Sequence, residues 1–240
     1  MQCFVINLTA DSERMAHTNS VLERHSFIKA ERIDAVRGSS LPDIAGEMLT
    51  GKPESKNHKG VLGCSLSHAA AWEKALRAGT EWSLILEDDS DAESLEKLRD
   101  FQLSSDIDLV FCNGRMVYQQ TGIALLPILP AFAFITRNNT GVGTDGYLIS
   151  HRGARKLLEF FARDGFYSHV DLRLAAYSLT LEEIETLPQR EYIIRDICIL
   201  RRIYDATHHL TARVLGVAIT RHVKGASSSR KAEDERGGMG

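Results

Sequence analysis

Residues 82–91 read WSLILEDDSD, and this stretch decides the fold of the chain. Trp82 to Leu86 form a short, mainly apolar run that is typical of a buried β-strand, and the run ends abruptly in polar residues. In open α/β sheets, ligands bind beyond the carboxyl ends of the strands. We therefore expect Glu87, Asp88 and Asp89 to lie at a binding edge of a sheet.

Strands and helices alternate on both sides of this run, which predicts a single α/β domain with a mostly parallel central sheet. The domain is expected to span residues 1–224, with a disordered tail over 225–240. Residues 39–60 are rich in proline and glycine and are expected to form a loop. Further strands are predicted at residues 3–6, 32–36, 108–112 and 147–149. Helices are predicted from Ser65 or Ser67 to Gly79, over 95–101, from Ser150 to Gly165, and over 170–179 and 193–222.

Composition and charge narrow the class of protein. The 240-residue chain has 43% hydrophobic and 25% charged residues, as an ordinary globular protein does. A formal net charge of −3 does not indicate nucleic acid as a partner. The four cysteines include no CxxC pair, so neither a disulfide framework nor a zinc site is expected. Since the sequence shows no leader and no run of about 20 apolar residues, it predicts a cytoplasmic protein.

The three consecutive carboxylates that follow the strand predict a cation site. Adjacent like charges repel each other, so a cation or polar partners should accompany them, and hard oxygen ligands suit Mg²⁺ or Mn²⁺. Alternation along the chain would point Glu87 and Asp89 to the same side. Asp89 is then expected to hold the metal, while Glu87 would bind either the metal or the ribose of a ligand. Asp88 would then point elsewhere and stabilise the turn. The alternative is a solvated acidic loop followed by a helix N-cap.

Five motifs occur in the order that is found in one enzyme family. They are VINL (5–8) with Arg14, RIDAVRG (32–38), GVLGCSLSH (60–68), LILEDD (84–89) and GTDGYLIS (143–150). On these motifs the chain resembles glycosyltransferase family 25, the lipopolysaccharide-biosynthesis group that also includes collagen galactosyltransferases. Two residues depart from the family pattern: Val61 stands where the family often has glutamate, and Asp145 is a charged residue between Thr144 and Gly146.

The resemblance implies a GT-A-like nucleotide-diphospho-sugar transferase fold, a UDP-sugar donor, a metal at Glu87–Asp89 and inversion at the anomeric carbon. The implied reaction moves a hexose, galactose or glucose, to a lipopolysaccharide, a lipooligosaccharide or a related surface glycan. A divalent cation, Mn²⁺ or Mg²⁺, would stabilise the charge on the departing diphosphate. The alternatives are a non-catalytic glycan-binding member of the same superfamily and a different metal enzyme, such as a nucleotidyltransferase or a glycoside hydrolase.

Individual residues have predicted roles in this reaction. Inverting transfer needs a base for the acceptor hydroxyl, and the candidate is Asp171, whose alternative role is to favour a helix dipole. Asn7 and Arg14 flank the first strand-to-helix turn, where Arg14 could pair with phosphate. Ser67 and His68 are expected to begin a helix whose backbone N–H groups face the diphosphate. The other predicted donor contacts are Leu8, Asp88, Gly143 and Thr144, and the predicted acceptor contacts are Asp145 and His169.

The region 190–224 holds seven Lys or Arg residues against three Asp or Glu residues, among many apolar ones. This pattern is compatible with a basic amphipathic surface that contacts an anionic membrane, such as the inner face of the plasma membrane, where a glycolipid acceptor would reside. The alternative is a packed helix with one wet face. His208 or His209 is a candidate to complete the metal shell, with an ordinary surface or core histidine as the alternative.

Overall fold

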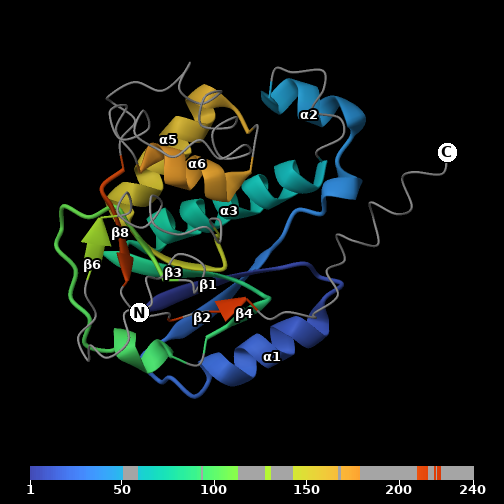
Figure 1. Ribbon diagram of the computed structural model, residues 1–240. Coiled ribbons are helices and arrows are strands. Elements are labelled where there is room, and N and C mark those ends of the chain that lie inside the picture. Colours follow the sequence, from blue (N-terminus) through green and yellow to red (C-terminus); the bar gives the residue numbers. More distant parts are fainter. Residues whose placement is uncertain are drawn as a thin grey trace.

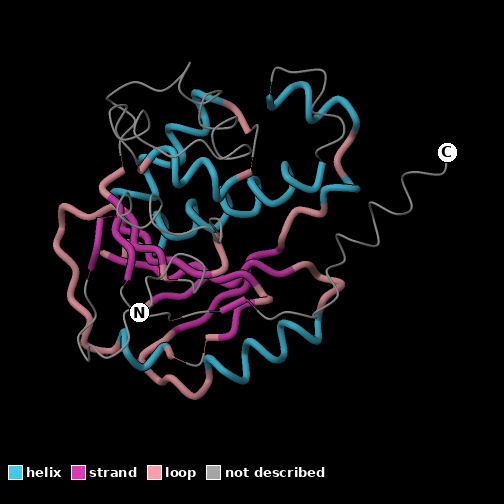
Figure 2. Tube along the Cα trace, viewed as in Figure 1, coloured by secondary structure: helices cyan, strands magenta, loops and turns pink. Residues whose placement is uncertain are grey.

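Apolar strands form the centre of the protein, as the computed structural model shows (Figures 1 and 2). The structure describes residues 1–50, 59–92, 94–112, 128–130, 143–166, 169–178, 210–215, 219 and 221–222. The predicted tail over 225–240, the candidates His208 and His209, and most of the predicted helix over 193–222 lie outside these residues. None of the described helices is both long enough and apolar enough to cross a membrane.

The described residues build a seven-stranded sheet in the order β2-β1-β3-β7-β5-β8-β6. The pairings show that β1, β2, β3, β5 and β8 run in one direction, while β7 and β6 run in the other. The strands are β1 (Gln2–Asn7), β2 (Lys29–Asp34), β3 (Trp82–Glu87), β5 (Leu109–Phe111), β6 (Ile128–Pro130), β7 (Gly146–Ser150) and β8 (Ala212–Leu215). The predicted α/β domain with a mostly parallel sheet is thus confirmed. β4 (Ser90–Asp91) and β9 (Arg221–His222) form a second, two-stranded sheet.

Helices cover both faces of the large sheet (Figure 1). Alternate residues of each strand face opposite sides, so Phe4 and Ile6 of β1 pack in one apolar cluster and Cys3 and Val5 pack in the other. The first cluster lies under α3 (Lys59–Ala78), α5 (His151–Asp164) and α6 (Val170–Tyr177). The second lies between the sheet and α1 (Ser12–Leu22), together with the 3-10 helix η3 (Leu95–Leu98).

Several predicted helix ends are confirmed by their cap geometry. The side chain of Ser150 accepts a hydrogen bond from the backbone N–H of Gly153 at 3.0 Å, which caps α5. α3 ends just before Gly79 and α5 just before Gly165, whose φ angles are +65° and +80°. Glycine adopts such left-handed angles without the steric cost that other residues meet.

The start of α3 was predicted wrongly, and two glycines near it serve a packing role. The helix begins at Lys59, so Ser67 and His68 lie in its middle and their N–H groups are not at a helix end. A Cβ at Gly63 would lie 2.5 Å from the carbonyl oxygen of Val36, and one at Gly38 would lie 2.4 Å from that of Lys59. Close approach of the two backbones therefore requires glycine at both positions.

Two further predictions of secondary structure were wrong. The stretch 39–60, expected to be a loop, contains the 3-10 helix η1 (Gly38–Ser40), the helix α2 (Asp43–Thr50) and the first residues of α3. Pro42 precedes α2, a place where proline is tolerated because the first N–H groups of a helix have no partner within it. The stretch 193–222, expected to be helical, contains strands β8 and β9 where it is described.

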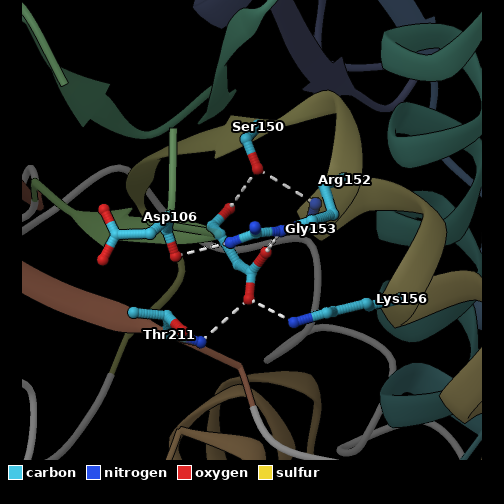
Figure 3. Close-up of polar contacts among 7 residues, drawn as sticks. Asp106, Ser150, Arg152, Gly153, Lys156 and Thr211 are labelled. Carbon is cyan, nitrogen blue, oxygen red and sulfur yellow. Dashed lines mark hydrogen bonds and ion pairs between the residues drawn. The ribbon is translucent and has the colours of Figure 1, made fainter. Parts of the chain in front are cut away.

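A buried carboxylate fastens three segments at the amino end of β5 (Figure 3). The side chain of Asp108 is fully buried and pairs with Arg152 Nε at 2.6 Å and Lys156 Nζ at 2.7 Å. It also accepts the backbone N–H of Thr211 at 2.9 Å. Asp108 therefore joins β5 to α5 and to the chain that enters β8.

Candidate active site

The carboxyl ends of β1 and β3 meet the start of β7 at one edge of the sheet. β7 runs antiparallel to β3, so the residues before Gly146 lie next to those after Leu86. The backbone N–H of Glu87 donates to the carbonyl of Asp145 at 3.2 Å, and that of Asp88 donates to the carbonyl of Ile6 at 3.1 Å. These bonds hold the Glu87–Asp89 turn at the edge where ligands bind in open α/β sheets.

Three carboxylates gather at this edge. Oxygen atoms of Glu87, Asp89 and Asp145 all lie within 4.8 Å of one another. Alternation along the chain correctly placed Glu87 and Asp89 together. Asp145, for which the sequence predicts an acceptor contact, lies with them because β7 is antiparallel. Its position just before a strand was visible in the sequence, but the direction of that strand was not.

Polar side chains from three elements surround the carboxylate of Glu87. The hydroxyl of Thr144 donates to Glu87 Oε1 at 2.6 Å, and His68 Nε2 lies 3.4 Å from the same atom. The other ring nitrogen, His68 Nδ1, lies 2.8 Å from the hydroxyl oxygen of Tyr147, which also accepts the indole N–H of Trp72 at 2.8 Å. A hydrogen-bonded chain thus runs from the core helix α3 to the acidic edge.

The pKa values of two side chains in this hydrogen-bonded network, His68 and Tyr147, are shifted. Burial alone lowers the pKa of His68, but interactions with Tyr147, Cys64 and Glu87 outweigh it and raise that pKa well above its usual value. Burial also raises the pKa of Tyr147, so its hydroxyl stays protonated at neutral pH.

Asp88 points away from the acidic cluster and toward the first strand-to-helix turn. Its carboxylate accepts a hydrogen bond from Asn7 Nδ2 at 2.7 Å and pairs with Arg14 at 3.3 Å. Its backbone carbonyl accepts the hydroxyl of Thr18 at 3.4 Å. Burial raises the pKa of Asp88, although Asn7 and Arg14 act in the opposite direction. These contacts fit the predicted orientation of Asp88 and its predicted role in stabilising the turn.

A pocket opens beside the acidic cluster, between this turn and α3. Its volume is about 100 Å³, smaller than the ~300–1,000 Å³ of typical small-molecule sites, so it would hold only part of a nucleotide sugar. The lining residues include the predicted Leu8, Arg14, Ser67, His68 and Glu87–Asp89, together with Arg37, Gly38, Gly60 and Cys64. Sequence reasoning missed Arg37, although it lies in the RIDAVRG motif directly before Gly38.

The remaining predicted residues divide into two groups. Ser67 lines the pocket, but its hydroxyl accepts a hydrogen bond from the N–H of Val36 and donates one to the carbonyl of Gly63. These two bonds link the residues that follow β2 to α3. Asp171 stands in the first turn of α6, and His169 precedes that helix. Neither Asp171 nor His169 is among the residues that line the pocket.

The fold and the pocket define an α/β protein with a cluster of acidic side chains at the carboxyl edge of its sheet. This chain belongs to glycosyltransferase family 25, because the family model described as "Glycosyltransferase family 25 (LPS biosynthesis protein)" matches residues 1–172. The GT-A-like fold that the sequence resemblance implied agrees with this membership and with the observed α/β domain.

The curated relatives include animal and bacterial proteins. The chain is 29% identical over 171 residues to procollagen galactosyltransferase 1-B of Xenopus laevis, with 65% of this chain and 28% of the relative covered. It is 30% identical over 172 residues to the lacto-N-neotetraose biosynthesis glycosyltransferase LgtB of Neisseria meningitidis serogroup B, with 68% and 62% covered. It is 30% identical over 175 residues to a probable inactive glycosyltransferase 25 family member 3 of Rattus norvegicus, with 65% and 29% covered.

The chain thus spans less than a third of the length of the procollagen galactosyltransferase. Among solved structures, it is similar to an active-site mutant of LgtC, with a TM-score of 0.43, 13% sequence identity, and coverage of 99% of this chain and 95% of the other.

Proposed function

We propose that this chain transfers a hexose, galactose or glucose, from a UDP-sugar to a lipopolysaccharide, lipooligosaccharide or related surface-glycan acceptor, with inversion at the anomeric carbon. The observation that carries the proposal is the cluster of Glu87, Asp89 and Asp145, whose oxygens lie within 4.8 Å of one another at the carboxyl edge of the sheet. The names of two relatives, a galactosyltransferase and a lacto-N-neotetraose biosynthesis enzyme, support a sugar of this kind.

The donor set of the cluster fits a hard divalent cation. Three carboxylates supply only oxygen ligands, which suit Mg²⁺ and Mn²⁺, and a cation would offset the repulsion among them. We assign the metal to Glu87 and Asp89 with Asp145 as a third ligand. Such a cation stabilises the negative charge that develops on a nucleoside diphosphate as it leaves.

The chain's own residues provide the rest of the donor site. Arg14 and Arg37 line the pocket beside the acidic cluster, and a guanidinium binds phosphate oxygens in a planar, two-pronged manner. Thr144 and His68 hold the Glu87 carboxylate in place. Asn7 and Asp88 fix the turn that carries Arg14. We also propose that Leu8 and Gly143 contact the sugar donor.

The acceptor side remains a prediction carried by the family resemblance. We keep Asp171 as the base that takes the proton of the acceptor hydroxyl as that oxygen attacks the anomeric carbon. His169 is its neighbour on the acceptor side. Replacement of Asp171 by asparagine should lower kcat by a factor of 10² or more, the low end of general-base catalysis, and leave UDP binding unchanged.

The test of the donor and metal sites is thermal stabilisation by UDP with Mn²⁺. The wild-type protein should gain stability only when both are present, and Asp89→Asn should abolish the gain while the variant stays folded. Asp34→Asn is the matched control, since Asp34 ends the neighbouring strand β2 but its side chain is 80% exposed and pairs with Arg32. A set of UDP-hexoses assayed for metal-dependent transfer or hydrolysis then identifies the sugar.

Glycan binding without catalysis is the competing function. It is supported by the relative that is named as a probable inactive member of the family. The acidic cluster of this chain argues for catalysis, because a protein that only binds glycans has no need for a cation at a diphosphate. Glycan binding without turnover of any UDP-hexose, and without stabilisation by UDP and Mn²⁺, would replace our proposal with this one.

A further inference from the structure

A second group of potential metal ligands lies beside the acidic cluster and differs from it in chemistry. Cys64 Sγ, a ring nitrogen of His68 and a carboxylate oxygen of Glu87 all lie within 4.8 Å of one another. Cys64 and His68 are four residues apart on α3, so their side chains share one face of the helix. All three residues line the pocket. Counting cysteines in the sequence cannot find this group, because only one cysteine takes part.

The spacing of two of these atoms fits a bound metal as well as it fits the long hydrogen bond between them. His68 Nε2 and Glu87 Oε1 are 3.4 Å apart, beyond the ~2.7–3.2 Å of ordinary N–H···O bonds. In a tetrahedral zinc site, a nitrogen and an oxygen that each lie about 2.0–2.1 Å from the metal are about 3.3 Å from each other. The two atoms are therefore placed as zinc ligands are placed.

The surroundings of His68 also match those of a zinc-binding histidine. Such a histidine usually hydrogen-bonds through its second ring nitrogen, which fixes the ring orientation. Here Nδ1 lies 2.8 Å from the hydroxyl oxygen of Tyr147, and Trp72 holds that hydroxyl in turn. The Glu87 carboxylate is likewise held by Thr144 at 2.6 Å. The imidazole and the carboxylate thus both have an outer partner.

We propose that Cys64, His68 and Glu87 bind Zn²⁺ at a site distinct from the hard-cation cluster. A thiolate, an imidazole and a carboxylate form the mixed sulfur, nitrogen and oxygen set that zinc takes, whereas Mg²⁺ and Mn²⁺ favour oxygen alone. Binding takes the Cys64 thiol as a thiolate and His68 as a neutral imidazole, so the thiol proton and the proton of a cationic His68 are released to solvent. Since the three ligands line the pocket, the fourth position of the ion opens toward it.

The shared ligand gives zinc an inhibitory effect, and this consequence rests on the proposed function. Glu87 belongs both to the zinc group and to the acidic cluster. A zinc ion bound to Glu87 withdraws that carboxylate from the cation that assists the departing diphosphate. Zinc therefore opposes sugar transfer even when Mn²⁺ is in excess.

Cobalt is the probe for the site, because Co²⁺ replaces zinc in such sites and a Co²⁺–thiolate bond gives a charge-transfer absorption in the near ultraviolet. The full chain titrated with Co²⁺ should show this band, and Cys64→Ser should lose it. Cys198→Ser removes a different thiol and should keep the band. Asp89→Asn changes only the acidic cluster and should also keep it.

Three results would overturn the proposal: no band in the wild-type protein, a band of full size in Cys64→Ser, or loss of the band in Asp89→Asn. The last result would mean that there is only one cation site. Circular dichroism of each variant shows whether it is folded, and a His68→Gln variant, which should also weaken Co²⁺ binding, provides the second test if Cys64→Ser fails to fold.

Inhibition is measured separately, as the zinc concentration that halves each variant's own zinc-free rate. That concentration should rise at least about tenfold in Cys64→Ser, since even the loss of an outer-shell partner costs a metal site about 10–100-fold. Equal zinc sensitivity in wild type and Cys64→Ser would refute the inhibitory role. The cobalt band needs no activity, so the zinc site and the proposed sugar transfer can fail independently.

Discussion

The two ends of the same sheet carry acidic groups with opposite arrangements. At the amino end of β5, the single carboxylate of Asp108 is matched by Arg152 and Lys156. At the carboxyl end of β3, three carboxylates lie within 4.8 Å of one another, and the partners found for Glu87 are a hydroxyl and an imidazole. The first arrangement is complete without a ligand. For the second we propose a bound cation, so the comparison sets a structural charge against a proposed functional one.

The largest expected effect is on stability, at the Asp108 end. Asp108→Asn should cost about 3 kcal/mol of unfolding free energy, the low end for a broken buried ion pair. The low end applies because Arg152 and Lys156 are partly exposed and can regain water. Urea unfolding measures the loss. Asp106→Asn is the control, since Asp106 is exposed and should change stability by less than about 0.5 kcal/mol. If Asp108→Asn lowered the unfolding free energy by less than about 1 kcal/mol, the proposed difference between the two ends of the sheet would be wrong.

The next effect is on metal binding, at the other end. At a free Mn²⁺ concentration of one hundred times its dissociation constant, the wild-type protein should gain about 2.7 kcal/mol of stability. Asp145→Asn should lose most of that gain, because it removes one of the three ligands. Thermal unfolding with and without Mn²⁺ measures both quantities. A variant that keeps the full Mn²⁺ response would show that Asp145 is no ligand.

The attachment of α3 to the site gives a smaller effect and a matched pair of variants. Gly63→Ala should cost about 2 kcal/mol, as overpacking does, because the added methyl would lie 2.5 Å from the carbonyl oxygen of Val36. Gly60→Ala, one turn earlier in the same helix, meets no atom within 4 Å and should stabilise the protein by about 0.5 kcal/mol. Chemical denaturation compares the two. Equal effects would mean that helix propensity, and not close packing, selects glycine at position 63.

The last effect appears only at alkaline pH and concerns buried groups that carry no charge at neutral pH. Burial raises the pKa of the Cys3 and Cys112 thiols from 9.0 to about 12. Above pH 9 the unfolded chain loses these protons while the folded chain keeps them, so stability falls as pH rises from 9 toward 12 and is unaffected below 9.

Each thiol should contribute a slope of up to about 1.4 kcal/mol per pH unit. Urea unfolding at pH 8 and pH 10 measures the slope, and a Cys3→Ala/Cys112→Ala double variant should show a shallower one. Identical slopes in the two proteins would contradict the prediction.

The sequence predicted those parts of the fold that depend on local patterns. The strand at 82–86, the cap at Ser150 and the terminating glycines at 79 and 165 follow from apolar runs and from backbone preferences of single residues. The sequence could not show that Gly63 lies against Val36, because that contact joins segments far apart in the chain.

The same distinction holds for the site. Glu87, Asp88 and Asp89 are adjacent in the chain, so alternation alone predicted which two act together. Asp145 joined them only because β7 runs antiparallel to β3. Arg37 and Cys64 reach the pocket through the packing of α3 against the residues that follow β2. These positions depend on strand direction and helix packing, which a single sequence does not encode locally.

The position of β8 bears on how the protein is made. This strand lies between β5 and β6, near one side of the sheet, yet it comes from residues well beyond the 1–172 match to the family. During synthesis, β5 and β7 leave the ribosome long before the strand that will cover the free side of β5. The nascent chain therefore carries an open sheet edge, the kind of surface that pairs with other chains, until residues 212–215 emerge and close it.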